Sequence, residues 1–149
     1  MQGYFKLPEQ TAAVFRDGYF RTGDMGRVDS EGHLYITGRI KEMLIVGGEN
    51  VFPREIEEVL NRHASVKASG VVGRRDPLRG ELPVAFVELN EGHAFDEPAL
   101  RTWCRENLAG YKVPVDIQVL EALPRNPTGK IMRRELQKMV GEKGERGNR

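Results

Sequence analysis

Lys130, near the end of the chain, has neighbours that suit the binding of an anion. It follows the segment Pro-Arg-Asn-Pro-Thr-Gly at residues 124–129. If Thr128 caps a final helix, Lys130 lies in the first turn, where its charge opposes the helix dipole. That helix would direct an ammonium and free backbone N–H groups at one anion. The alternative is a solvated lysine on a charged helix. A GxxxxGK[ST] phosphate loop is excluded, because Pro124 replaces the first glycine and Ile131 follows the lysine.

Two charged groups upstream could hold a nucleotide. Asp24 follows a Thr-Gly turn, and an ionised carboxylate accepts two hydrogen bonds at once, which suits the vicinal hydroxyls of a ribose. The planar fork of Arg39 can hold ribose or phosphate oxygens. The ammonium of Lys41, two residues further on, makes contacts with less defined geometry than the arginine fork. The alternatives are that Asp24 caps a turn and that Arg39 and Lys41 are exposed charges at a strand end.

Gly47 and Gly48 end the apolar run at residues 43–46. Neither glycine has a side chain, so a narrow substituent such as a pantetheine arm could pass close to the backbone. An ordinary corner between a strand and a helix would also need glycine, and both interpretations stay open. Pro53 favours the start of a helix shortly afterwards.

The composition describes an ordinary globular chain. It has 149 residues, 39% hydrophobic and 30% charged, with a net charge of +1. No basic stripe alternates with aromatic residues, which disfavours nucleic acid as a partner. The apolar runs are too short for a transmembrane segment. Cys104 is the only cysteine, which favours a reducing cytoplasm, and we predict no metal site because one cysteine and three scattered histidines give no ligand spacing.

Strands and helices alternate along most of the chain. We expect a short helix near residues 9–15, a hairpin formed by residues 26–28 and 33–37, strands at 43–46, 66–73, 82–89 and 116–120, and helices beginning near residues 53, 96 and 128. This pattern predicts an α+β (mixed) fold. Its main part would be a small α/β domain with a short antiparallel or mixed sheet flanked by helices.

Three segments in this order resemble the carboxyl-terminal part of the adenylate-forming acyl-CoA synthetases. They are GYFRTGD at residues 18–24, the stretch at 38–53, and PRNPTGK at 124–130. The resemblance extends from Gly3 to Leu136. The same superfamily contains peptide-synthetase adenylation domains and luciferases.

The resemblance implies a division of the chain into three parts. Residues 1–38 would be the β-hairpin remnant at the end of a large N-terminal adenylation domain. Residues 39–140 would form the mobile C-terminal domain, and the charged, Gly-rich residues 141–149 a flexible tail. The Ser/Thr/Gly-rich phosphate loop, the acyl pocket and the acidic residue that positions Mg²⁺ would lie in the missing domain. We therefore expect the isolated chain to be unable to activate an acid.

Members of this family use ATP, CoA and Mg²⁺. A carboxylic acid and ATP first give an acyl-adenylate and pyrophosphate, and after rotation of the small domain the CoA thiol gives acyl-CoA and AMP. By resemblance, Lys130 would bridge the acid carboxylate and the α-phosphate in the first step. The other assignments are Asp24 and Arg39 on the ribose hydroxyls, Asn50 on the nucleotide, Lys41 as the hinge, and Gly47, Gly48 and Glu49 along the pantetheine tunnel.

The hinge residue favours one branch of the family. Many peptide-synthetase adenylation domains have an aspartate where this chain has Lys41, so we expect a fatty or aryl acid–CoA ligase. Some relatives have a lysine in place of Ile45, and no nucleotide contact is assigned there. Two alternatives remain: the matching piece of a peptide-synthetase adenylation domain, and a free-standing module that docks on an adenylating partner.

Overall fold

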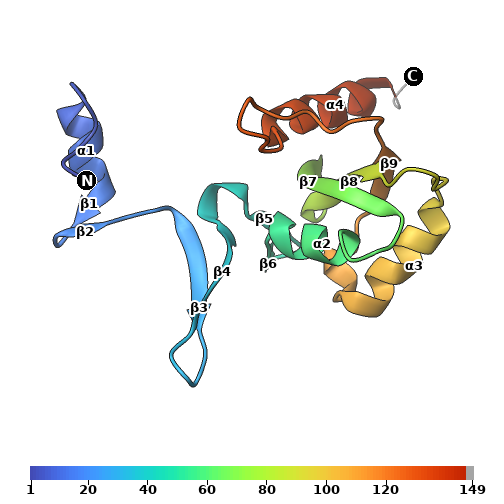
Figure 1. Ribbon diagram of the computed structural model, residues 1–149, viewed down its shortest axis with the longest axis horizontal. Helices are drawn as coiled ribbons and strands as arrows, with labels where there is room; N and C mark the ends of the chain where they lie inside the picture. The colour runs from blue at the N-terminus through green and yellow to red at the C-terminus, as the bar shows by residue number, and fades with distance from the viewer. Residues whose placement is uncertain (147–149) are drawn as a thin grey trace. The chain divides into compact units, whose positions relative to one another are not determined.

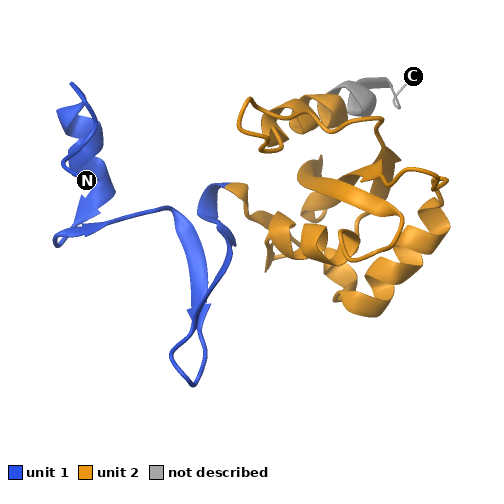
Figure 2. Cartoon of the chain, viewed as in Figure 1, with its two compact units in different colours: residues 1–41 blue, residues 42–149 orange. Residues whose placement is uncertain are grey.

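The computed structural model describes residues 1–146, and residues 147–149 lie outside the described part. The chain separates into two compact units, residues 1–41 and 42–149 (Figure 2). The division falls directly after Lys41, the predicted hinge. The predicted tail at residues 141–149 coincides in part with helix α4, which continues to Arg146.

The first unit consists of one short helix and two hairpins. Helix α1 (Pro8–Val14) precedes the pair β1 (Phe15–Arg16) and β2 (Tyr19–Phe20). Strands β3 (Asp24–Val28) and β4 (Leu34–Arg39) form an antiparallel hairpin. The predicted helix and hairpin are thus confirmed. Large apolar side chains of this unit stay exposed, with Phe5 86% and Tyr19 80% accessible.

The second unit is built on a five-stranded sheet (Figure 1). Its strands are β5 (Leu44–Val46), β6 (Glu49–Val51), β7 (Val66–Asp76), β8 (Gly80–Leu89) and β9 (Asp116–Val119). Strand β8 pairs antiparallel with β7 and parallel with β9, and it meets β5 through Val46 and Gly80. The sheet is therefore mixed, as predicted.

Helices cover both faces of this sheet. Helices α2 (Pro53–Leu60) and α3 (Glu97–Asn107) bury their apolar side chains in one core cluster, and α4 (Arg133–Arg146) in another. Val87 of β8 belongs to the first cluster and Phe86 to the second. A strand that is covered on both faces becomes a nearly continuous buried run. The 3₁₀ turns η1 (Ile40–Glu42) and η2 (Gly110–Lys112) complete the described elements.

The start of α3 follows the predicted pattern. Asp96 is its N-cap, and the carboxylate oxygen Oδ1 accepts a hydrogen bond from the N–H of Ala99 at 2.9 Å. The indole Nε1 of Trp103 donates to the carbonyl of Val59 at 2.8 Å, which joins α3 to α2. Cys104 is buried in the same helix, and burial raises the pKa of its thiol to about 11. None of the described helices combines the length and the apolar character needed to cross a bilayer.

Glu88 places a carboxylate in the interior of the sheet. Its side chain is 7% exposed, and Oε1 lies 2.6 Å from Nζ of Lys67. Oε2 accepts a hydrogen bond from the N–H of Leu123 at 3.2 Å and lies 3.6 Å from Nη2 of Arg125. The hydrogen bond from Lys67, followed by that from Leu123, lowers the pKa of Glu88 against the opposing effect of burial. Glu88 thus connects β8 to the segment that leads to Lys130.

This arrangement predicts an acid-sensitive contribution to stability. A depressed pKa in the folded state stabilises the fold above the unfolded pKa of about 4.5, and this contribution is lost as the pH falls through the folded value. We expect Glu88→Gln to lower the free energy of unfolding by about 1–2 kcal/mol at pH 7. The difference from wild type should vanish at low pH, which urea denaturation at a series of pH values would measure.

Glu91→Gln is the matched control, because it removes the same charge from an exposed position two residues after the end of β8. Its stability should follow wild type throughout. A Glu88→Gln deficit of equal size at pH 7 and at the lowest pH measured would contradict the electrostatic explanation.

Candidate functional site

Lys130 lies in a closed loop, residues 125–131, here called the lysine loop. Arg125 and Ile131 form an antiparallel bridge across its base. The N–H of Asn126 donates to the carbonyl of Lys130 at 2.9 Å, and outside the loop the N–H of Met132 donates to the carbonyl of Pro124 at 2.8 Å. The two ends of the loop are therefore held together by backbone hydrogen bonds.

The side chain of Asn126 fixes the interior of the lysine loop. Its Oδ1 accepts hydrogen bonds from the N–H of Thr128 at 3.0 Å, the hydroxyl of Thr128 at 2.7 Å and the N–H of Lys130 at 2.9 Å. The N–H of Gly129 donates to the carbonyl of Asn126 at 2.9 Å. Gly129 has a φ of +83°, which glycine adopts without strain. Sequence reasoning missed Asn126, although an Asn-Pro-Thr-Gly cluster is a recognised loop signal.

The prediction that Thr128 caps a helix with Lys130 in its first turn is wrong. Helix α4 begins at Arg133. The Oδ1 of Asn126 takes the N–H groups of residues 128 and 130, and such local bonds compete with helix formation. Lys130 is exposed, and its ammonium has no hydrogen-bond or ion-pair partner among the described residues.

Arg125 attaches the lysine loop to the sheet. Its Nη1 donates to the carbonyl of Gly129 at 3.1 Å, while Nη2 lies 3.6 Å from the carboxylate of Glu88 in β8. Glu88 is buried, so its carboxylate holds the guanidinium of Arg125 in a defined place. Arg125 therefore links the buried strand to the residue directly before Lys130.

Gly47 and Gly48 form the turn of a hairpin, not a corner between a strand and a helix. Val46 pairs with Glu49 across the turn, and the two glycines have φ values of +61° and +90°. Positive φ at both central residues defines a type I′ turn, which favours glycine. The sequence did not predict β6, a strand of three residues that carries Glu49 and Asn50. A Cβ added to either glycine would meet no atom within 4 Å, so backbone geometry alone requires glycine within this chain.

Asp24 and Arg39 are brought together by the hairpin of the first unit. They are direct partners in the register of β3 and β4, and Nε of Arg39 lies 3.2 Å from Oδ1 of Asp24. The N–H of Asp24 donates to the hydroxyl of Thr22 at 3.1 Å. The Arg39 side chain is 64% exposed and that of Asp24 28%, so both groups can be reached by a ligand. Lys41, in η1, is exposed.

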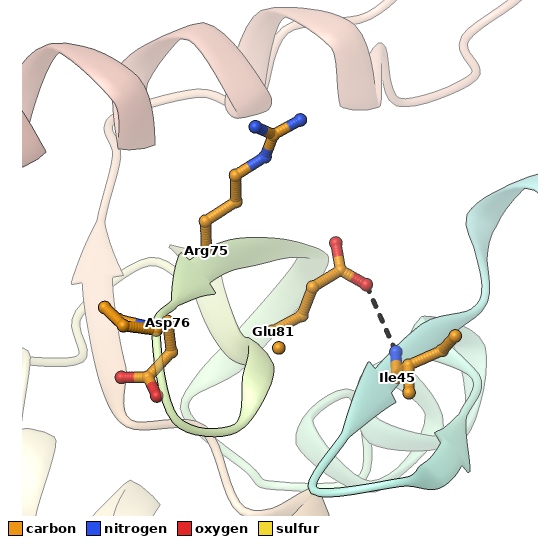
Figure 3. Close-up of a pocket in the computed structure, with 6 residues that line it drawn as sticks. Ile45, Arg75, Asp76 and Glu81 are labelled. Atoms are coloured by element: carbon orange, nitrogen blue, oxygen red, sulfur yellow. Dashed lines mark hydrogen bonds between the residues drawn. The ribbon is translucent and has the colours of Figure 1, made fainter.

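An open groove of about 700 Å³ lies beside β5 and the turn between β7 and β8 (Figure 3). It is lined by Ile45, Arg75, Asp76, Pro77, Gly80 and Glu81. Glu81 points toward Ile45, whose N–H donates to Oε2 of Glu81 at 3.1 Å. Acidic and basic groups are mixed along the groove, and none of the predicted site residues lines it. We assign it no ligand.

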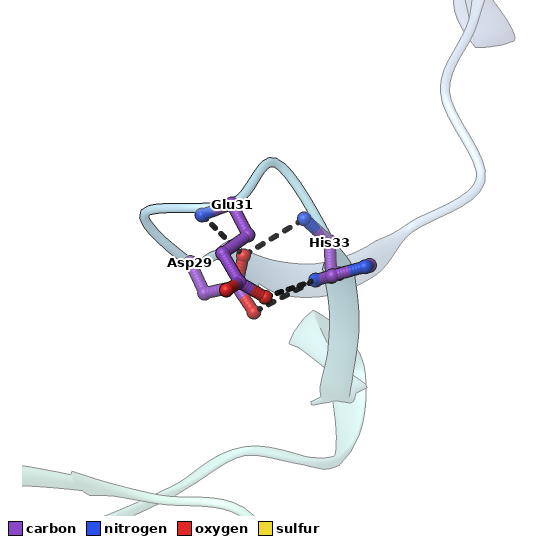
Figure 4. A group of neighbouring side chains, drawn as sticks. All are labelled: Asp29, Glu31 and His33. Atoms are coloured by element: carbon purple, nitrogen blue, oxygen red, sulfur yellow. Dashed lines mark hydrogen bonds and ion pairs between the residues drawn. The ribbon is translucent and has the colours of Figure 1, made fainter.

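Asp29, Glu31 and His33 gather in the turn between β3 and β4 (Figure 4). Oδ1 of Asp29 accepts hydrogen bonds from the backbone N–H groups of Glu31 at 3.0 Å and His33 at 2.9 Å. The bond from His33 contributes most to lowering the pKa of Asp29. Nδ1 of His33 lies 3.2 Å from the other oxygen of Asp29. These contacts are those of a side chain that closes a turn, and we assign no metal to them.

Comparison with known sequences identifies the second unit. The family model of the AMP-binding enzyme C-terminal domain matches residues 55–130, about half of the chain. The 2-succinylbenzoate–CoA ligase of Geobacillus kaustophilus is 47% identical over 93% of this chain and 28% of its own length. The long-chain-fatty-acid–CoA ligase of Bacillus subtilis is 46% identical over 91% of this chain and 24% of its own length.

Solved structures agree with this result. The o-succinylbenzoate CoA synthetase of Bacillus subtilis, in complex with its acyl-adenylate intermediate, superposes with a TM-score of 0.86 at 39% identity. The match covers 92% of this chain and 28% of that one. The chain thus spans about a quarter of the length of the relatives it matches. The sequence and fold together show that it belongs to the family of AMP-binding enzyme C-terminal domains.

Proposed function

We propose that this chain is the C-terminal portion of a cytoplasmic, ATP-dependent ligase that joins a fatty or aryl acid to CoA. It would act with a large N-terminal adenylation domain. The carboxylate of the acid attacks the α-phosphorus of ATP and releases pyrophosphate. The CoA thiol then attacks the acyl carbon, loses its proton and releases AMP. The observation that carries the proposal is the exposed ammonium of Lys130, which lies on a closed loop and has no partner among the described residues.

Lys130 has the charge and the setting that the first step requires. Negative charge lies on both the acid carboxylate and the α-phosphate, and an ammonium with three donors can contact the two groups at once. A donor that is fixed before the reaction stabilises the transition state without reorganisation. The bonds of Arg125 and Asn126 hold the backbone at Gly129 and Lys130.

The remaining predicted residues divide between the two units. We propose that Asp24 and Arg39 hold the ribose hydroxyls, since the hairpin places their polar groups side by side. On the other unit, the exposed turn at Gly47 and Gly48 would line the pantetheine tunnel together with Glu49. Asn50, next along β6, would contact the nucleotide. Lys41 would be the hinge between the units.

The Mg²⁺ that accompanies ATP has no fitting site among the described residues of this chain. Among the described residues, the one group of three potential ligands is Asp29, Glu31 and His33. Asp29 is already occupied with backbone N–H groups of its own turn. We therefore expect the metal to be held by the large domain. The named CoA-ligase relatives favour CoA as the acceptor over a carrier protein.

A chimera tests this function. This chain would replace the equivalent lobe of the Geobacillus kaustophilus ligase, and pyrophosphate release would report the first step with 2-succinylbenzoate. We expect the chimera to form the adenylate and Lys130→Ala to reduce that rate about 10²- to 10³-fold, because a charge contact to the transition state is lost. Thioester formation from supplied acyl-adenylate should be retained.

Lys138→Ala is the control for a lost positive charge. Lys138 lies in α4 with a 58% exposed side chain, and it pairs with Glu135 of the same helix. Its removal should leave both half-reactions intact. A folded chimera without adenylation, or an equal loss in both steps for Lys130→Ala, would refute the proposed function.

To test the tunnel assignment, a side chain must be added to the Gly47–Gly48 turn without straining its backbone. Leucine at Gly48 would strain the backbone whatever the site does, because φ there is +90°. Gly47→Asn suits a type I′ turn, in which asparagine is common at the first central position. In the chimera we expect it to slow thioester formation at least tenfold while adenylation is retained, since the added side chain would obstruct the thiol.

Gly92→Asn provides the matched comparison. Gly92 has a φ of +79°, and a Cβ added there would meet no atom within 4 Å, yet it lies outside the predicted tunnel. It should leave thioester formation unchanged. A normal rate of thioester formation in the Gly47→Asn chimera would contradict the assignment of the tunnel to this turn.

A further inference from the structure

Arg133 binds two carboxylates that lie far from it in the sequence. Its Nη1 and Nη2 donate to the two carboxylate oxygens of Glu57, with 2.9 Å between Nη2 and Oε2. Its Nε donates to Oε2 of Glu42 at 3.0 Å. Burial opposes the charge on the guanidinium, but the hydrogen bonds and charges of Glu57 and Glu42 outweigh it and raise the pKa of Arg133. Arg133 therefore keeps its positive charge at any working pH.

The two contacts of Arg133 differ in their surroundings. Glu57 lies in α2 with only 9% of its surface exposed, and its Oε1 also accepts from the N–H of Val71 in β7 at 2.7 Å. This contact is fixed in the core. The Glu42 side chain is 38% exposed and belongs to η1. Exposed ion pairs contribute little to stability, so the Glu42 contact mainly constrains geometry.

Each end of the Glu42–Arg133 contact adjoins a residue of the proposed mechanism. Glu42 directly follows Lys41, the proposed hinge. Arg133 follows Lys130 by three residues, and the segment between them is held by the bridge of Ile131 to Arg125. A displacement of Arg133 is therefore passed to the lysine loop through the backbone.

We propose that Glu42 and Arg133 are positioning residues that fix the lysine loop relative to the hinge. A rotation about Lys41 then carries Lys130 to the nucleotide together with the rest of its lobe. Without this contact the residue after the hinge and the lysine loop could move separately, and Lys130 would be misplaced. The inference rests on the proposed function, and both residues act through Lys130 without touching substrate.

Glu42→Gln tests the contact, because it removes the charge and keeps the shape. In the chimera we expect the maximal rate of adenylation to fall about tenfold, as misplacement of a reacting group by a fraction of an ångström produces losses of this order. The KM values for ATP and acid and the thermal unfolding midpoint should stay at the wild-type level. Arg133→Lys should show the same kinetic loss, because an ammonium lacks the fork that reaches both carboxylates.

Glu55→Gln is the matched control. Glu55 is 44% exposed and forms an ion pair of 2.7 Å with Lys112, so it resembles Glu42 in exposure and in having a cationic partner. It lies in α2, away from the hinge in sequence, and does not contact Arg133 among the described contacts. Adenylation by this variant should equal that of the unmodified chimera.

The Lys130→Ala background separates positioning from general stabilisation. If Glu42 acts through Lys130, adding Glu42→Gln to Lys130→Ala should not reduce the residual adenylation rate further. A second tenfold loss would show an independent effect and overturn the inference. Full adenylation by Glu42→Gln, with the loss for Lys130→Ala intact, would also overturn it and leave the proposed function standing. An unaffected Lys130→Ala chimera would reject the proposed function itself.

Discussion

The position of Lys130 depends on one acceptor atom, Oδ1 of Asn126. Three donors from residues 128 and 130 converge on it, so these groups are not available to begin a helix. Arg125 and Ile131 close the base of the loop, and Glu88 holds Arg125 from the sheet. Because Glu88 lies on β8, where both helical layers pack, the most buried strand and the exposed lysine belong to one continuous set of contacts.

Elements with a clear apolar pattern could be predicted from the sequence, and strand β6 could not. The helix that begins near residue 96 and the strand near residue 116 follow from spacing and apolar pattern. Strand β6 is three residues long and has one apolar residue, Val51, so no apolar pattern indicates it. The start of α4 was misplaced because Thr128 is a good helix cap in isolation, whereas the side chain of Asn126 outcompetes it locally.

In the candidate site, the type of a residue could be predicted from the sequence, but its partners could not. Asp24 and Arg39 could be identified by type, but their pairing depends on a shift in the register of the hairpin between Met25 and Gly26, which no sequence pattern indicates. Arg133 could not be identified, because its partners Glu57 and Glu42 lie 76 and 91 residues away in the sequence. A charged residue at the start of a helix gives no sign of such partners until the fold brings them together.

The cations around the lysine loop differ in whether a carboxylate pairs with them, and this difference affects how each could bind an anion. Arg125 is paired with Glu88 and Arg133 with Glu57 and Glu42, whereas Lys130 between them has no partner among the described residues. A paired ammonium would have to give up its partner before it could bind a phosphate, and that loss would be subtracted from the binding energy. An unpaired, exposed one loses only water. The two arginines hold the backbone, and the charge of Lys130 stays free of them. In the proposed first step its attraction would therefore act where negative charge develops in the transition state.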